Sequence, residues 1–106
     1  MNNLNTIEQI KDLIKDNKFT MIYFSSDGCN VCENIMPRLE EMLIKYPSIV
    51  SGHVEVQKLA SVASVFGVYT IPTIVLFLEE KEVLRQARFI NFLELEEEIK
   101  RYSEFV

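Results

Sequence analysis

The chain has 106 residues, of which 48% are hydrophobic and 25% are charged, and its formal net charge is −5. This length and apolar content suit one folded domain with its own core, so we expect a single domain over residues 1–106 and no disordered chain. An acidic chain without a cluster of lysine or arginine is a poor candidate for binding nucleic acid or an anionic membrane.

Helical spacing and apolar runs predict the elements of the first half of the chain. Thr6 and Gln9 resemble a capping box, which marks the start of a helix that ends at Asn17. Residues 19–24 form a nearly continuous apolar run of strand-forming residues, which is typical of a buried strand. The elements that follow are a loop at 25–28, a helix from about 29 to 46 with Pro37 inside it, and a strand at 49–56.

Turn residues and charges divide the second half into shorter elements. Gly67 ends a short helix, because glycine readily takes the left-handed conformation found after helix C-termini. A charged tip then joins two strands as a hairpin. The expected elements are a short helix at 59–66, a strand at 73–78, the tip at 79–82, a strand at 83–89 and a helix that starts at Asn91.

The order helix, strand, helix, strand, helix, strand, strand, helix predicts an α/β fold. Parallel strands need helical crossovers, whereas the short charged tip makes an antiparallel pair. We therefore expect a mixed four-stranded sheet with helices on both faces.

The segment Cys29-Asn30-Val31-Cys32 is the strongest chemical signal. It follows a buried strand and opens a helix, so the spacing brings the two sulfurs together in the first turn. Unpaired amides and the positive end of the helix dipole stabilise a thiolate, the reactive form of cysteine. We expect Cys29 to be the exposed nucleophile and Cys32 the buried resolving thiol.

The cysteine pair has two other interpretations. Both cysteines could be small apolar core residues, which is the structural alternative. A zinc site is not expected, because the chain has two cysteines in all and His53 is its one histidine.

The chain resembles the thioredoxin family over essentially its whole length after the first few residues. Pro37 lies where the family has a helix-kinking proline, and residues 67–73 are similar to the segment that leads into the family's cis-proline. The resemblance implies a thioredoxin fold, a cis-proline at Pro72 beside the cysteines, and a backbone at Ile71 that binds substrate. The extra N-terminal strand of the longer members is missing here or ends just before this chain.

Several positions depart from the family pattern. Asn30-Val31 replaces the Gly-Pro between the cysteines, and Gly28 replaces the tryptophan before them. The family's buried acid aligns with Tyr23, which we expect in the core with its hydroxyl bonded to a partner. The other differences are His53 near the family's paired lysine and Phe89 at a substrate-facing glycine.

Three charged or titratable residues near the pair have ordinary interpretations. We expect Asp27 to cap the second helix and Glu33 to be an exposed first-turn acid. Glu55 could accept a proton in place of the missing acid, but a surface position on an edge strand is the simpler expectation. His53 is likewise expected at the surface rather than as a ligand.

The resemblance implies dithiol–disulfide exchange and a role in redox homeostasis. Substrates would be protein or small-molecule disulfides or dithiols, bound at Ile71, Pro72 and Phe89. No cofactor is expected beyond an external electron donor, such as a thioredoxin reductase or a small thiol. A protein-binding module with little turnover and a thiol redox sensor are the alternatives.

A location in the cytoplasm and a monomeric state complete the expectations. The N-terminus lacks the features of a secretory leader, and no apolar run approaches the length that spans a membrane. In the cytoplasm, two cysteines more often form a catalytic or metal-binding pair than a structural disulfide.

Overall fold

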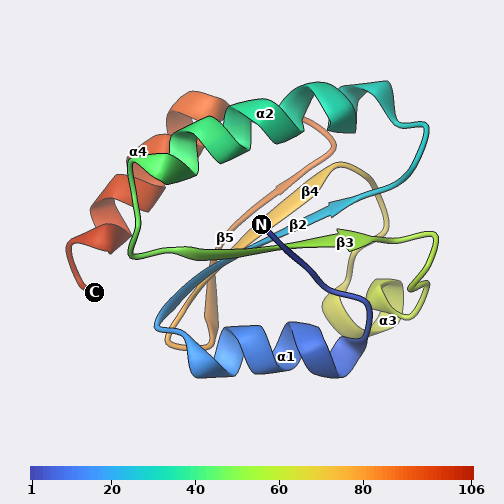
Figure 1. The fold of residues 1–106 in the computed structure, drawn as a ribbon, viewed down its shortest axis with the longest axis horizontal. Helices are drawn as coiled ribbons and strands as arrows, with labels where there is room; N and C mark the ends of the chain where they lie inside the picture. The colour runs from blue at the N-terminus through green and yellow to red at the C-terminus, as the bar shows by residue number, and fades with distance from the viewer.

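A computed structural model describes residues 1–106. A mixed five-stranded sheet with the strand order β1-β3-β2-β4-β5 lies between two layers of helices. Helices α2 and α4 cover one face of this sheet, and α1 and α3 cover the other (Figure 1). The elements are β1 (Asn2–Asn3), α1 (Ile7–Asp16), β2 (Phe19–Ser25), α2 (Asn30–Ile44), β3 (Val50–Glu55), α3 (Val62–Phe66), β4 (Thr73–Leu78), β5 (Lys81–Ala87) and α4 (Phe92–Ser103).

Strand β2 is the centre of the fold. All seven of its residues are buried, as the apolar run predicted. It pairs in parallel with β3 and antiparallel with β4, so both of its edges and both of its faces are covered. Because the strand is held on every side, the segment that leaves its C-terminal end starts from a fixed point.

The predicted helix starts are confirmed by their caps. The backbone N–H of Gln9 donates to Thr6 Oγ1 at 3.0 Å, and the N–H of Glu94 donates to Asn91 Oδ1 at 3.0 Å. Gly67 follows α3 with a left-handed φ of 66°. The side chains of Thr6 and Asn91 satisfy amides that the first turn of a helix leaves unpaired.

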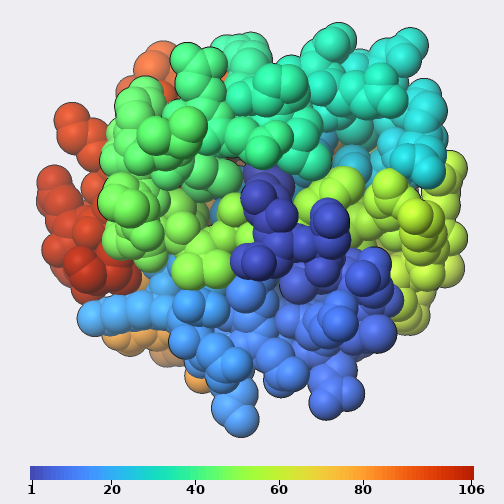
Figure 2. Space-filling view, viewed as in Figure 1, coloured from blue at the N-terminus to red at the C-terminus, as the bar shows by residue number.

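The prediction of four strands was wrong by one. Asn2 and Asn3 form β1, which pairs in parallel with Gly52 and His53 of β3. Figure 2 shows this N-terminal segment, in dark blue, at the surface between the two helical layers. Two exposed asparagines have no strand-like pattern, because asparagine is depleted in strands and two residues show no alternation.

The hairpin is also tighter than the sequence indicated. Strand β5 starts at Lys81 rather than at residue 83, because Glu79 and Glu80 alone make the turn. Their φ angles are 50° and 70°, the left-handed values that two-residue hairpin turns require. Neither residue is a glycine or an asparagine, so the usual sequence signal for this turn is absent.

Two hydrophobic clusters hold the helical layers to the sheet. The larger joins one face of β2 and β4 to α2 and α4, and it contains Tyr23, Cys32, Leu39 and Leu95. The second joins the other face to α1 and α3. The paired cysteines therefore lie at the edge of the larger cluster.

Gly52 of β3 offers a test of how closely the N-terminal segment packs. A Cβ at this position would meet the side chains of Leu4 and Leu13. We expect Gly52→Ala to lower the free energy of unfolding of the oxidised protein by about 1–3 kcal/mol, measured by urea denaturation, because it overpacks a buried contact. Ser51→Ala in the same strand is the control and should stay within about 0.5 kcal/mol of wild type. Equal effects of the two substitutions would show that Leu4 does not pack as described.

Candidate active site

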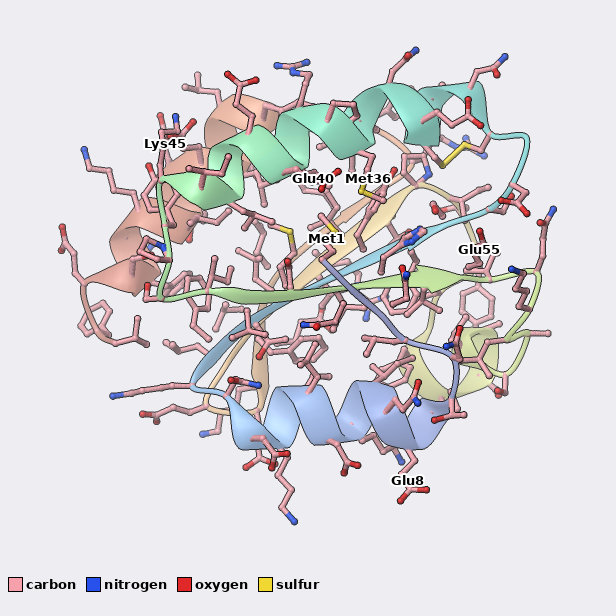
Figure 3. The ribbon with its side chains drawn as sticks, viewed as in Figure 1. Met1, Glu8, Met36, Glu40, Lys45 and Glu55 are labelled. Carbon is pink, nitrogen blue, oxygen red and sulfur yellow. A yellow bond between two sulfur atoms is a disulfide. The ribbon has the colours of Figure 1, made fainter.

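The two cysteines lie where β2 leads into α2, and they form a disulfide. Figure 3 shows this bond in yellow at the end of the sheet where Glu55 also lies. Cys29 is the N-cap residue of α2, with the extended backbone angles φ −87° and ψ 98°, and Cys32 lies in the first turn. The helix start therefore places both sulfurs beside the unpaired amides of the helix N-terminus.

The two sulfurs differ in hydrogen bonding and in exposure at the start of α2. The backbone N–H of Cys32 donates to Cys29 Sγ at 3.2 Å, in the way an oxygen side chain caps a helix. The residue Cys29 is partly exposed, whereas Cys32 is only 3% exposed. A donor and the helix dipole act on a sulfur that solvent can reach, which favours its thiolate over that of the buried partner.

The residue before the pair is a glycine for a backbone reason. Gly28 has a φ of +79°, a left-handed conformation that L side chains rarely adopt. A Cβ there would meet no atom within 4 Å, so backbone conformation rather than space favours glycine.

Tyr23 takes the place that the resemblance gives to a buried acid. Its ring is fully buried, and its hydroxyl donates to the carbonyl oxygen of Cys32 at 2.9 Å. Burial raises the pKa of Tyr23 to about 12, so the hydroxyl stays protonated over the physiological range. The expected buried position and hydrogen bond of Tyr23 are confirmed.

His53 is half-buried rather than at the surface. Its ring stacks on the Tyr23 ring with centroids 5.6 Å apart and an interplanar angle of 27°. Its Nε2 makes a short hydrogen bond with Ser25 Oγ at the end of β2. Burial lowers the pKa of His53 below its ordinary value, and the nearby carboxylates of Glu55 and Asp27 oppose that effect.

A cavity of about 270 Å³ connects these groups to the buried cysteine. It lies between the start of α2 and the ends of β2 and β3. Its lining residues are Ser25, Ser26, Asp27, Cys32, Glu33, Met36, Pro37, His53 and Glu55. The cavity gives the otherwise covered Cys32 a polar approach.

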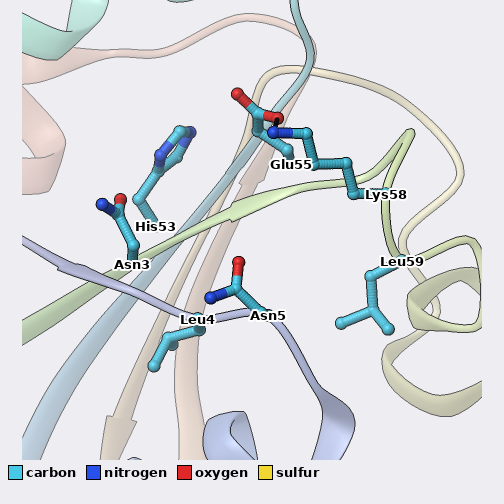
Figure 4. Close-up of a pocket in the computed structure, with 7 residues that line it drawn as sticks. All are labelled: Asn3, Leu4, Asn5, His53, Glu55, Lys58 and Leu59. Atoms are coloured by element: carbon cyan, nitrogen blue, oxygen red, sulfur yellow. Dashed lines mark ion pairs between the residues drawn. The ribbon is translucent and has the colours of Figure 1, made fainter.

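A second cavity of about 240 Å³ reaches His53 from the side of β1 (Figure 4). Asn3 and Asn5 line it together with His53, Glu55 and Lys58. The carboxylate of Glu55 lies 3.0 Å from Lys58 Nζ, and this bond lowers the pKa of Glu55. Glu55 is thus an ion-paired side chain at the cavity rim.

The segment that was expected to bind substrate lies against the same core cluster as Cys29. Ile71 packs against that cluster, and the peptide bond between Ile71 and Pro72 is cis. The Pro72 carbonyl oxygen accepts a hydrogen bond from the backbone N–H of Arg88 at 2.7 Å. This bond holds the end of β5 beside the proline.

Phe89 is 80% exposed and follows Arg88 directly. The left-handed conformation that would favour a glycine lies at Arg88, with a φ of 71°, and not at Phe89. An apolar groove of about 510 Å³ starts at Ile71, and Arg88 rather than Phe89 lines it. Its other lining residues include Val56, Val68 and Tyr69.

Two site contacts differ from or go beyond the sequence expectations. Asp27 does not cap α2, because the side chain of Cys29 does so. The bond between Ser25 and His53 joins residues 28 positions apart, and no local pattern reports it. Strand β2 pairs in parallel with β3, with Tyr23 opposite His53. The bond between Ser25 and His53 could therefore be predicted only from the register of these two strands.

No group of three or more His, Cys, Asp or Glu side chains is arranged to hold a metal ion. None of the helices has the length and apolar character required to cross a membrane.

Comparisons with known proteins find relatives over nearly all of the chain. The family model described as Thioredoxin matches residues 3–101. The thioredoxin-like protein YdfQ of Bacillus subtilis (strain 168) is 41% identical over 101 residues, covering 95% of this chain and 90% of that protein. A thioredoxin of Ophiophagus hannah is 33% identical over 85 residues, covering 80% of each chain.

Solved structures agree with this result. The thioredoxin of Fasciola hepatica aligns with a TM-score of 0.86 at 30% identity, covering 95% of this chain and 98% of that one. A mutant thioredoxin from Halobacterium salinarum NRC-1 aligns with a TM-score of 0.87 at 25% identity, covering 99% and 92%. The predicted fold is confirmed by these neighbours.

Tyr23 provides a test of the site's buried hydrogen bond. Tyr23→Phe should lower the free energy of unfolding by about 1 kcal/mol at pH 7, because the hydroxyl no longer donates to Cys32. The folded-state pKa of about 12 lies above the ordinary value of 10.0, so this tyrosine's contribution is complete below pH 10 and is lost as the pH rises towards 12. Urea titrations at pH 7–12 should show the gap between wild type and variant shrinking above pH 10. A constant gap would contradict the assignment.

Proposed function

Because the chain belongs to the thioredoxin family, we propose that it is a protein-disulfide oxidoreductase that contributes to redox homeostasis. Family membership and the disulfide-bonded pair together support a redox oxidoreductase that acts on thiols and disulfides. The single observation that carries the finer proposal is the different treatment of the two sulfurs at the start of α2: one is partly exposed and capped by an amide, and the other is covered.

The proposed reaction has two steps. The Cys29 thiolate attacks a substrate disulfide, forms a mixed disulfide and expels one substrate thiolate. Cys32 then attacks Cys29 Sγ, so the bond between the cysteines forms while the bond to the substrate breaks. Two electrons pass to the substrate, and the cysteine pair becomes oxidised; the reverse sequence would oxidise a dithiol.

Substrate binding is assigned to the surface around Ile71, Pro72 and Phe89. Ile71 packs against the same core cluster as Cys29 and lines an apolar groove, which supports binding of an extended segment there. An external electron donor, such as a thioredoxin reductase or a small thiol, would restore the reduced pair. A monomer in the cytoplasm that needs no cofactor of its own is part of the same proposal.

Turnover is tested by the reduction of insulin disulfides with dithiothreitol as the electron donor. We expect the wild-type protein to accelerate precipitation of the insulin B chain, because the cysteine pair relays electrons from dithiothreitol. Cys29→Ser should abolish the acceleration, and Cys32→Ser should leave a mixed disulfide that is detected by mass spectrometry. A wild-type protein without any acceleration would contradict the enzyme proposal and favour the binding module.

The roles of the two cysteines are tested by alkylation of the reduced protein. Brief treatment with iodoacetamide should label Cys29 first, since Cys29 is partly exposed and its sulfur accepts a hydrogen bond from the amide of Cys32. Peptide mass spectrometry over a range of pH measures the two sites separately. Preferential labelling of Cys32 would reverse the proposed roles.

A further inference from the structure

The second step requires a buried thiol to lose its proton. Cys32 is 3% exposed, and burial in apolar surroundings raises the pKa of a thiol. A base within reach of the thiol, directly or through one water molecule, speeds the attack because it accepts the proton as the thiolate forms. The titratable groups that contact Cys32 or line the cavity beside it are the candidates for this base.

Two of the candidates are poorly suited. Tyr23 contacts Cys32, but its hydroxyl already donates to the Cys32 carbonyl oxygen and its pKa of about 12 keeps it protonated. Glu55 lines the cavity, but Lys58 holds its carboxylate at 3.0 Å and lowers its pKa, which makes it a weaker base.

His53 has the right chemistry and the right place. Its ring lines the cavity together with Cys32, and it is fixed by stacking on Tyr23 and by the hydrogen bond with Ser25. It also lines the second cavity on the β1 side (Figure 4), which offers a route for proton exchange with solvent. We propose that His53 accepts the proton of Cys32 through the shared cavity during the resolving step, an inference that rests on the function proposed above.

The step balances as follows. The proton on Cys32 Sγ passes to the neutral imidazole, and the resulting thiolate attacks Cys29 Sγ. The Cys29–Cys32 bond forms as the bond between Cys29 and the substrate sulfur breaks, and the substrate leaves as a thiolate that takes up a proton. His53 later returns its proton to solvent, so it is unchanged over the cycle.

Charged groups from several elements set the protonation of His53. Burial lowers its pKa, as does the N-terminal amine, while Glu55 and Asp27 raise it. Of the other titratable groups, Tyr23 stacks on the His53 ring, and Glu33 and Lys58 each line one of the two cavities. Because burial has the largest effect, the imidazole is neutral at pH 7 and free to accept a proton.

The test separates the two steps with 5,5′-dithiobis(2-nitrobenzoate), a small disulfide that releases one coloured thiolate when Cys29 attacks and a second when Cys32 resolves. We expect the rate of the second phase to rise with pH through an inflection at the pKa of His53. In His53→Gln this inflection should vanish and the second phase should slow by about 10²-fold at pH 7, while the first phase is unchanged. A second phase in His53→Gln that matches wild type would overturn the inference.

Glu55→Gln is the matched control, because it lines the same cavity and removes a carboxylate. It should keep the inflection but move it to lower pH, since the carboxylate no longer stabilises the imidazolium. Loss of the inflection in this variant would assign the base to Glu55 instead.

The chain has one histidine, so its imidazole can be titrated by NMR without assignment. The pKa of this signal in the mixed disulfide of Cys32→Ser should match the kinetic inflection of the wild type. A mismatch would overturn the inference even if His53→Gln does not fold. A missing first phase, by contrast, would contradict the proposed function itself.

Discussion

The hydrogen bond from the Tyr23 hydroxyl to the Cys32 carbonyl oxygen ties the reactive turn to the centre of the sheet. Tyr23 lies in a strand whose residues are all buried, so the position of its hydroxyl is fixed by packing on both faces. This carbonyl belongs to Cys32 in the first turn of α2, and the backbone N–H of the same residue donates to Cys29 Sγ. One neutral side chain therefore connects core packing to the geometry around the sulfurs.

A phenol at this position changes the electrostatics of the site. A buried carboxylate would place a negative charge beside a forming thiolate and would need a partner to offset its desolvation. Tyr23 has a pKa of about 12, so it remains neutral at physiological pH. It needs only a hydrogen-bond acceptor, which the Cys32 carbonyl supplies. The task of accepting a proton then falls to the neighbouring strand, where His53 stacks on the same ring.

Much of the fold could be predicted because its signals are local. The Thr6 cap and the apolar run of β2 each lie within a few residues, and the cysteine pair marks the strand-to-helix junction by its spacing. The Glu79–Glu80 turn and the bond between Ser25 and His53 could not be predicted, for two different reasons. The turn lacks its usual residues, whereas the bond depends on how β2 and β3 align.

The strand that the sequence did not reveal has consequences at the site. Because β1 pairs with Gly52 and His53, β3 is not an edge strand at these positions, and the Leu4 amide bonds to the His53 carbonyl oxygen at 2.9 Å. Asn3 then lies beside His53 in the cavity of Figure 4, which Leu4 also lines, and the His53 ring is half-buried. Burial is the largest influence on the pKa of His53. The pairing of Asn2 and Asn3 with β3 therefore helps to set the protonation of His53, which lines the same cavity as Cys32.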